Sequence, residues 1–435
     1  MDMNELARRA SAAAIQLAGA GAELKNKALR EVAWALLHRQ DEIVAANKAD
    51  LARSEQENLP EPLLKRLKFD EAKIADMVDG ISSLIGLEDP VGKTLLATEL
   101  DEGLELYKVT CPIGVIGVIF ESRPDALVQI STLGLKSGNA VLLKGGTEAR
   151  ETNRVLADII AAASVAAGLP DGWLALLETR ADVDALLKLD RYIDLIIPRG
   201  SNAFVRYIMD NSRIPVMGHA DGICHVYVAA DADTAMAVNI VADAKTQYVA
   251  VCNALETLLV DQAAAAAFLP ALHERLAGKV ELVGCERTAA VIPVAPATDQ
   301  DWATEYLDYK LAVKVVAGLD EAIDHINTYG SGHTDAIVTA DRQKAARFME
   351  YVDSANVFWN CSTRFSDGFR YGFGAEVGVS TAKLHARGPV GLEGLVIYKY
   401  KLLGHGQTVG EYAERVRKFT HKKMSGAFPL ELENK

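Results

Sequence analysis

The chain has little cysteine, and its few cysteines follow no paired pattern. Five occur among 435 residues, at positions 111, 224, 252, 285 and 361, and none forms a C-x-x-C pair. The odd count and the wide spacing argue against a disulfide framework or a zinc site, and they are typical of reduced thiols in the cytoplasm. No metal is predicted. Each cysteine is therefore a free thiol that could act as a nucleophile.

Long apolar runs and an excess of positive charge are also missing. No segment reaches the ~18 consecutive apolar residues that a membrane span requires. Lys and Arg number 46 against 59 Asp and Glu, a net charge of −13, which disfavours nucleic acid or an anionic membrane as a partner. Arg8-Arg9 before an apolar segment resembles an export signal, but Glu5 is acidic and Gln16 interrupts the run. A cytoplasmic location is therefore predicted.

The hydrophobic pattern predicts an α/β chain. Apolar residues at three-to-four spacing indicate helices within 3–57 and from residue 70. A hairpin is expected at 95–110, and short apolar strands then alternate with helices, which predicts parallel sheets covered on both faces. The expected strands are 113–120, 140–144, 175–177, 193–197, 226–228, 257–260, 280–283, 312–316, 336–339 and 356–359. A late strand, 395–402, is expected to pair with the hairpin of a neighbouring subunit, and 411–435 to form a helix and a loose end.

Cys252 lies between a polar run and a predicted core strand. A thiol where a loop enters such a strand is held rigidly while its sulfur faces a cleft. Asn253 and local backbone N–H groups could donate hydrogen bonds to an oxygen anion formed on a carbon attached to that sulfur. The alternative is a packed, unreactive thiol, because free cysteine is among the most buried residue types.

Two strand-to-helix junctions fit the binding of nucleotide phosphates. Glycines there let phosphate approach backbone N–H groups, and a helix N-terminus favours negative charge. The residues of the two junctions are Lys144, Gly145, Gly146, Thr147, Gly200 and Ser201. Ordinary glycine turns with a solvated lysine are the alternative. The G-x-G-x-x-G fingerprint is absent, which indicates a less common variant of the Rossmann fold.

Three further segments carry residues suited to anions. Ser122 and Arg123 stand at a strand end, where Ser122 could donate to an oxyanion and Arg123 could bind a phosphate or carboxylate bidentately. A helix cap and a surface arginine are the alternative. Arg387 lies in a basic, glycine-flanked segment that without context is typical of a surface loop. His219 lies in a polar loop, where histidine is more often structural than catalytic.

Five longer motifs occur in the order V-I-F-E-S-R-P-D-A, G-N-A-V-L-L-K-G-G, H-A-D-G-I-C-H-V-Y-V, V-C-N-A-L-E-T-L-L-V and G-A-E-V-G-V-S-T-A-K-L-H-A-R-G-P-V-G-L-E-G-L. Together they resemble the gamma-glutamyl phosphate reductase family, a proline-biosynthesis branch of the aldehyde dehydrogenase superfamily. The resemblance spans roughly residues 5–410. It implies the aldehyde dehydrogenase-like α/β fold, with a Rossmann-type cofactor domain, an α/β catalytic domain and a small β oligomerisation element.

The resemblance implies reduction of L-glutamate 5-phosphate by NADPH to L-glutamate 5-semialdehyde and phosphate, the second step of proline biosynthesis from glutamate. The semialdehyde then cyclises spontaneously to 1-pyrroline-5-carboxylate. A homo-oligomer is implied, with dimer or tetramer left open, as is association with glutamate 5-kinase. The implied parts are an NADP-binding domain (1–93 and 112–244), a catalytic domain (245–387), an oligomerisation element (94–111 and 388–405) and a tail (406–435).

The resemblance also implies roles for single residues. The Cys252 thiolate attacks the acyl phosphate to give a thioester that accepts hydride, and the Cys252 N–H with a donor near Ser122 holds the oxyanion. His219 replaces the water-activating glutamate of hydrolytic members, so efficient hydrolysis is not expected. Thr147 replaces a glutamate that binds ribose in many NAD-using members, which favours NADPH. Glu305 resembles the glutamate that holds the nicotinamide ribose. Arg123, His219 and Arg387 are expected to contact substrate.

Two alternatives stay open at this point. One is another thioester-forming dehydrogenase, which uses acyl-CoA or a free aldehyde. The other is a non-catalytic protein that keeps the fold and binds nucleotide only. A requirement for phosphate separates the first from the reductase, and the presence of Cys252, Glu305 and Lys144 argues against the second.

Overall fold

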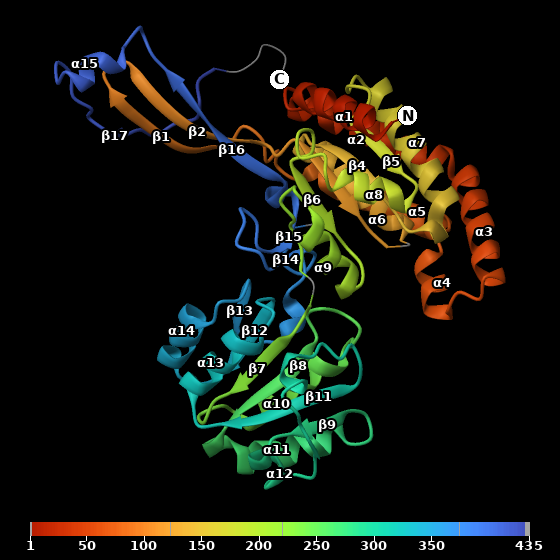
Figure 1. Cartoon of the computed structure of the whole chain (residues 1–435), viewed down its shortest axis with the longest axis vertical. Helices are drawn as coiled ribbons and strands as arrows, with labels where there is room; N and C mark the ends of the chain where they lie inside the picture. The colour runs from red at the N-terminus through yellow and green to blue at the C-terminus, as the bar shows by residue number, and fades with distance from the viewer. Residues whose placement is uncertain (1, 122, 220, 374, 431–435) are drawn as a thin grey trace.

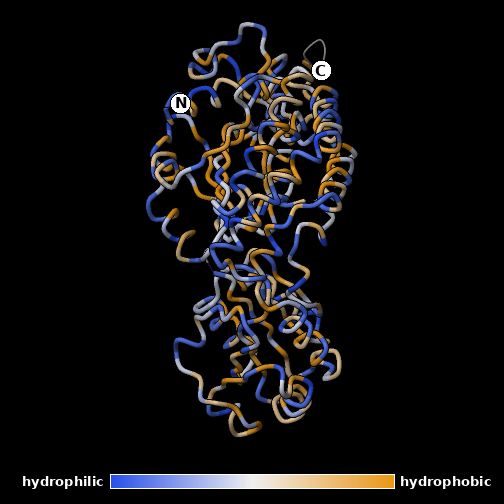
Figure 2. Tube along the Cα trace, turned by 90° about the vertical axis from the view of Figure 1, so that its right-hand side faces the viewer, coloured by the Kyte–Doolittle hydropathy of each residue, from blue (hydrophilic) through white to orange (hydrophobic). Residues whose placement is uncertain are grey.

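The computed structural model describes residues 2–121, 123–219, 221–373 and 375–430. Figure 1 shows two α/β bodies, one built from the N-terminal half of the chain and one from the following part, with a β-sheet arm that projects from the first. Apolar segments run through the interior of both bodies in Figure 2. No helix in the described ranges is both long and apolar enough to cross a membrane.

The first body places a parallel sheet, in the order β5-β4-β3-β6, among helices. Its strands β3, β4 and β6 are buried at every position, as their unbroken apolar sequences predict. The strands are β3 (Val115–Ile119), β4 (Ala140–Lys144), β5 (Leu174–Leu177) and β6 (Leu195–Pro198). Strand order reverses beside β3, so the loops after β3 and β6 meet at the switch point where open α/β sheets bind ligands.

Nine α-helices and one short 3-10 helix accompany this sheet in the described part of the first body. Asp70 caps α5 by accepting the Lys73 N–H, and Gly138 ends α6 with a φ of 77°. The helices are α1 (Met3–Leu17), α2 (Ala22–His38), α3 (Gln40–Gln56), α4 (Glu61–Leu67), α5 (Glu71–Gly86), α6 (Pro124–Ser137), η1 (Thr147–Ala149), α7 (Arg150–Ala166), α8 (Arg180–Leu186) and α9 (Asn202–Asn211). The short α4 was not predicted, because seven residues show too little periodicity.

The second body contains a seven-stranded parallel sheet in the order β10-β9-β11-β8-β7-β12-β13. Its strands are β7 (Cys224–Val228), β8 (Leu255–Asp261), β9 (Glu281–Gly284), β10 (Ala295–Pro296), β11 (Lys310–Val316), β12 (Thr334–Val338) and β13 (Asn356–Trp359). Leu258 faces one apolar core and Leu259 the other, so both faces of the sheet are covered. Central β8 is buried along its whole length.

Helices on both faces of this sheet complete the second body. They are α10 (Thr234–Thr246), α11 (Gln262–Leu276), α12 (Glu286–Ala289), η2 (Asp301–Ala303), α13 (Leu319–Tyr329), α14 (Arg342–Tyr351) and η3 (Thr363–Phe365). The domain boundary predicted after residue 244 is wrong. Strand β7 pairs with β8 and β12, and α10 packs in the same core, so the chain enters the second body before β7.

The arm is an antiparallel sheet in the order β16-β2-β1-β17. Its elements are β1 (Thr94–Asp101), β2 (Leu104–Pro112), β16 (Val396–Leu403), α15 (Val409–Ala413) and β17 (Lys422–Lys423). Strand β16 pairs with β2, the second strand of the hairpin, within its own chain. In the described part of the tail, residues 422–423 are not a loose end, because β17 pairs with β1. The Asn139 amide donates to the Leu395 carbonyl (2.7 Å), which brings the chain back beside β2.

Candidate active site

Cys252 lies in the turn that immediately precedes β8, as the sequence predicted, and it is half-buried. Gly222 packs against this turn so closely that an added Cβ would lie 2.2 Å from the Cys252 carbonyl oxygen. The Cys224 thiol donates to that oxygen (3.2 Å), and the Thr363 hydroxyl donates to the Asn253 carbonyl (2.7 Å). Contacts from two separate segments, one around Gly222 and Cys224 and one at Thr363, therefore fix the backbone of this turn.

A buried ion pair joins the two elements on either side of this turn. Lys245 of α10 lies 2.6 Å from Glu256 of β8, and both side chains are fully buried. Burial raises the pKa of Glu256 to about 7, against the opposing effect of the Lys245 ammonium, and burial lowers the pKa of Lys245. The Leu307 N–H also contacts the Glu256 carboxylate (3.4 Å). The pair ties α10 to β8, which agrees with a structural role for Glu256.

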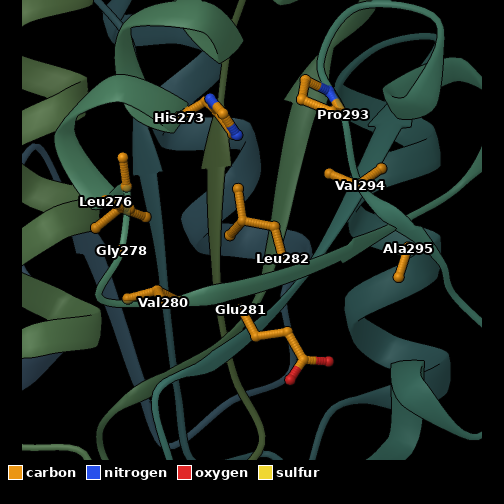
Figure 3. Close-up of a pocket in the computed structure, with 10 residues that line it drawn as sticks. His273, Leu276, Gly278, Val280, Glu281, Leu282, Pro293, Val294 and Ala295 are labelled. Atoms are coloured by element: carbon orange, nitrogen blue, oxygen red, sulfur yellow. The ribbon is translucent and has the colours of Figure 1, made fainter.

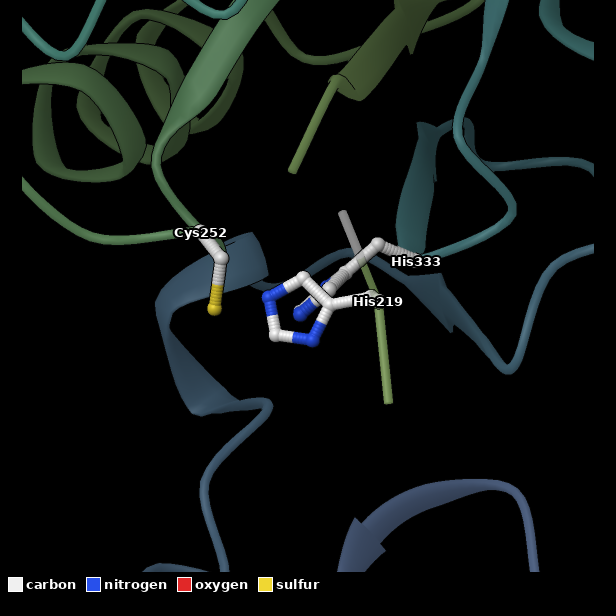
Figure 4. A group of neighbouring side chains, drawn as sticks. All are labelled: His219, Cys252 and His333. Atoms are coloured by element: carbon white, nitrogen blue, oxygen red, sulfur yellow. The ribbon is translucent and has the colours of Figure 1, made fainter. Parts of the chain in front are cut away.

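Two histidines lie beside the Cys252 sulfur (Figure 4). His219 Nδ1 contacts the Val379 carbonyl (3.0 Å), and its ring meets that of His333 edge-on with centroids 4.9 Å apart. One side-chain atom from each of His219, Cys252 and His333 lies within 4.8 Å of the others. His333 was not predicted, since it is buried just before β12 in a segment without a motif.

Two arginines interact electrostatically with Cys252, in a chain whose net charge is −13. Arg199, which follows β6, and Arg364 of η3 each interact electrostatically with Cys252. Burial lowers the pKa of both guanidinium groups, but arginine stays protonated in proteins. Arg123 lies near enough to interact with Arg199. The residue patterns gave Arg199 and Arg364 no role.

The first predicted phosphate junction forms a small hollow at the ends of β4 and β5. Gly145, Gly146 and Thr147 line it, together with Asn153 of α7. A Cβ on Gly145 would lie 2.3 Å from the Asn153 side-chain nitrogen, so a larger residue there would have to displace the Asn153 side chain. The side-chain oxygen Oδ1 of Asn153 is buried without a hydrogen-bond partner among the described residues. Lys144 is buried and donates to the Gly145 carbonyl. The glycine backbone and the Lys144 cation at this junction are compatible with a nucleotide phosphate.

The second junction meets a residue from the other body. Gly200 and Ser201 form the loop between β6 and α9. The side-chain amide of Asn202, at the start of α9, donates to Glu305 (2.6 Å) and to Asp221 (3.0 Å). Glu305 therefore reaches from the second body to the Gly200–Ser201 loop. The structure brings together three residues that the sequence could only assign separately to the cofactor.

The remaining predicted residues differ in what they contact. The buried Asn253 amide donates to the Ser366 carbonyl (2.7 Å), so it anchors this loop and the predicted oxyanion role of its side chain is not supported. The Arg387 guanidinium contacts the Asp353 carboxylate and donates to the backbone carbonyls of Asp353 and Thr381. Arg123 is exposed and lies 3.4 Å from Asp125. Ser122 lies outside the described residues.

A hollow of about 560 Å³ lies elsewhere, between the end of α11 and strands β9 and β10 (Figure 3). Its lining is largely aliphatic, with Leu276, Leu282 and Val294 around the polar side chains of His273 and Glu281. None of the predicted site residues lines it. The convergence of Cys252 with histidines and arginines, rather than the size of a hollow, therefore marks the candidate active site.

Comparisons with known proteins agree with this geometry. The model of the aldehyde dehydrogenase family matches residues 2–312. Gamma-glutamyl phosphate reductase of Pelotomaculum thermopropionicum is 74% identical over 98% of each chain, and that of Acetivibrio thermocellus is 70% identical over 99% of this chain and 100% of its own. The crystal structure of gamma-glutamyl phosphate reductase from Thermotoga maritima is 40% identical with a TM-score of 0.91, covering 94% of this chain and 100% of that chain.

Proposed function

The chain belongs to the gamma-glutamyl phosphate reductases of the aldehyde dehydrogenase family, and on this premise we propose that it reduces L-glutamate 5-phosphate to L-glutamate 5-semialdehyde and phosphate. This reaction is the second step of proline biosynthesis from glutamate, and its product cyclises spontaneously to 1-pyrroline-5-carboxylate. The observation that carries the proposal is the half-buried Cys252, held in a fixed turn and flanked by Arg199 and Arg364.

The first step is attack of the Cys252 thiolate on the acyl carbon. The S–C bond forms, the C–O bond to phosphate breaks, and the phosphate leaves with the bonding electrons. Arg199 and Arg364 interact electrostatically with Cys252, so they are proposed to attract the phosphate of the substrate. Arg123, His219 and Arg387 are proposed to contact the rest of the substrate.

A nicotinamide cofactor fits the two glycine junctions. Lys144, Gly145, Gly146 and Thr147 would hold its adenosine end, and Gly200, Ser201 and Glu305 its nicotinamide end. When bound, NADPH supplies the hydride that reduces the thioester. Thr147 is uncharged and exposed at its junction, so it leaves room for a 2′-phosphate that a carboxylate there would repel.

After reduction, the negative charge lies on the oxygen attached to the former acyl carbon. The backbone N–H of Cys252 is proposed to stabilise this oxyanion, with a second donor near Ser122. Collapse of the thiohemiacetal breaks the S–C bond, releases the aldehyde and restores the Cys252 thiolate. The side chain beside the sulfur is the imidazole of His219 rather than a carboxylate, so we expect slow hydrolysis of the thioester.

The three parts of the molecule take roles in this proposal. The first body binds NADPH, the second carries the nucleophile, and the arm is an oligomerisation element of a cytoplasmic homo-oligomer. Exposed apolar side chains on the arm agree with the last role; they include Leu95, Leu96, Tyr398, Tyr400 and Leu402.

The reverse reaction tests the proposed function. The full chain, given NADP and the semialdehyde, should form NADPH only when phosphate or arsenate is present. Coenzyme A should not replace phosphate. The Cys252→Ala variant should bind NADPH and lose turnover, whereas Cys285→Ala should keep it. Turnover without phosphate or arsenate, or turnover by Cys252→Ala, would contradict the proposal.

A further inference from the structure

We propose that His219, Cys252 and His333 form a binding site for a Zn²⁺ ion, which blocks the nucleophile reversibly. The three side chains come from separate segments: the loop before β7, the turn before β8 and the residue before β12. One ligand atom from each lies within 4.8 Å of the other two. Thiolate and imidazole are the ligands that zinc prefers, and three protein ligands with one open position are typical of an accessible zinc site.

His219 is oriented as a zinc ligand requires. Its Nδ1 lies 3.0 Å from the Val379 carbonyl, which can only accept a hydrogen bond, so the ring proton resides on Nδ1. The lone pair of Nε2 is then available, and Figure 4 shows a ring nitrogen of His219 directed toward the Cys252 sulfur. A metal-binding histidine commonly donates its other N–H to a backbone carbonyl in this way, which fixes the tautomer and the ring plane.

His333 supplies an independent observation. Its side chain is fully buried, its Nδ1 contacts the Thr334 hydroxyl (2.8 Å), and its Nε2 is buried without a partner among the described residues. A buried polar atom that lacks a partner is unfavourable, because it has lost its hydrogen bond to water. A metal ion bound beside Cys252 would satisfy this nitrogen.

The arrangement is close to a zinc centre but is not fully formed. From zinc bond lengths, ligand atoms of a tetrahedral site lie about 3.3–3.6 Å apart, so a spread of up to 4.8 Å requires small side-chain rotations. Half-buried Cys252 and His219 have the freedom to make them. Arg199 and Arg364 oppose a cation at the sulfur, which weakens binding relative to a structural zinc site and keeps it reversible.

Binding exchanges a proton for the metal. The Cys252 thiol loses its proton to solvent, the sulfur forms a bond to Zn²⁺, and no electron is transferred. The sulfur lone pair that would attack the acyl carbon is then held by the metal. Inhibition, unlike binding, rests on the proposed function.

Cobalt titration of the full chain under anaerobic conditions tests the binding site. Co²⁺ should give a thiolate-to-metal charge-transfer absorption, which Zn²⁺ should remove by displacement. Cys252→Ser should abolish this absorption, and His219→Asn and His333→Asn should each weaken cobalt affinity at least tenfold. Cys285→Ala and His385→Asn are matched controls that should bind as the wild type does, since neither residue belongs to the trio.

His333 is fully buried, so its replacement can impair folding, and for this reason His219 is replaced in a separate variant. Circular dichroism checks that each variant is folded. Wild-type cobalt affinity in either folded histidine variant, or a charge-transfer absorption that persists in Cys252→Ser, would overturn the proposal. In a second arm, Zn²⁺ should inhibit turnover and EDTA should restore it. If the wild type shows no reductase activity at all, the proposed function fails while the cobalt titration still decides the metal site.

Discussion

Replacement of Gly222 by alanine perturbs the backbone of the catalytic turn without touching a reacting group. The new Cβ would lie 2.2 Å from the carbonyl oxygen, 2.4 Å from the Cα and 2.6 Å from the Cβ of Cys252. An ordinary contact begins near 3.4 Å, and the atoms involved are backbone rather than the end of a flexible side chain. The turn must therefore shift by roughly 1 Å, a displacement that lowers catalytic rates about 100-fold when it affects a reacting group.

The stability of Gly222→Ala should change less than its activity. Overpacking of a well-packed site costs about 1–3 kcal/mol, which the fold should tolerate. We expect kcat in the phosphate-dependent reverse assay to fall about 100-fold, while NADPH binding, followed by its fluorescence, stays within a fewfold of wild type. The Gly145–Thr147 junction lies on another segment, so it should be unaffected.

Gly80→Ala is the matched control. Gly80 lies in α5 with no atom within 4 Å of an added Cβ, so this variant should keep its kcat and gain up to about 1 kcal/mol of stability from helix propensity. Wild-type kcat together with a wild-type thermal midpoint in Gly222→Ala would refute the claim that Gly222 positions Cys252. Equal loss of NADPH binding would instead indicate general misfolding.

Three further predictions concern charged groups of the site. Lys245→Met or Glu256→Gln alone should destabilise the fold by about 3–5 kcal/mol, because each leaves an uncompensated buried group. In thermal unfolding, the double variant should lose less stability than the sum of the two single losses. Additive losses would contradict this coupling. For Thr147→Glu, kcat/KM with NADPH divided by kcat/KM with NADH should fall at least about tenfold, which is equivalent to about 1.4 kcal/mol. An unchanged ratio would mean that the 2′-phosphate does not lie at Thr147. Arg364→Gln should raise KM for phosphate in the reverse assay about 10- to 100-fold, because a charged contact is lost. The control Arg347→Gln, at a surface residue, should leave this KM unchanged. Equal effects of the two variants would show that Arg364 does not bind the anion.

Local pattern predicted the elements that carry the site, because each depends on neighbouring residues. The apolar run of β8 and the glycine junctions after β4 and β6 could be located from sequence periodicity and turn residues alone. Pairing over long distances could not. The pattern of β16 predicts a strand but does not specify its partner, which is β2 of the same chain; the Asn139–Leu395 contact lies next to the start of this strand.

The same limit applies to the side chains around Cys252. His333 and Arg364 lie far along the chain in segments without a motif, and only folding brings them to the sulfur. For Asn253, by contrast, the neighbouring sequence suggested a role that the side-chain contacts do not support. Its position next to Cys252 suggested an oxyanion donor, but its amide nitrogen donates to the Ser366 carbonyl, a contact with a residue far along the chain that local pattern does not indicate.

The segment that contains Gly222 is also the crossing between the two bodies. The Met217 N–H still bonds to β6 of the first sheet, whereas the Ile223 N–H already bonds to Ser331 of the second. Within seven residues, the chain therefore passes from hydrogen bonds with one sheet to contacts with the other body and with the Cys252 turn. We expect any change in the relative position of the two bodies to alter the backbone close to this turn.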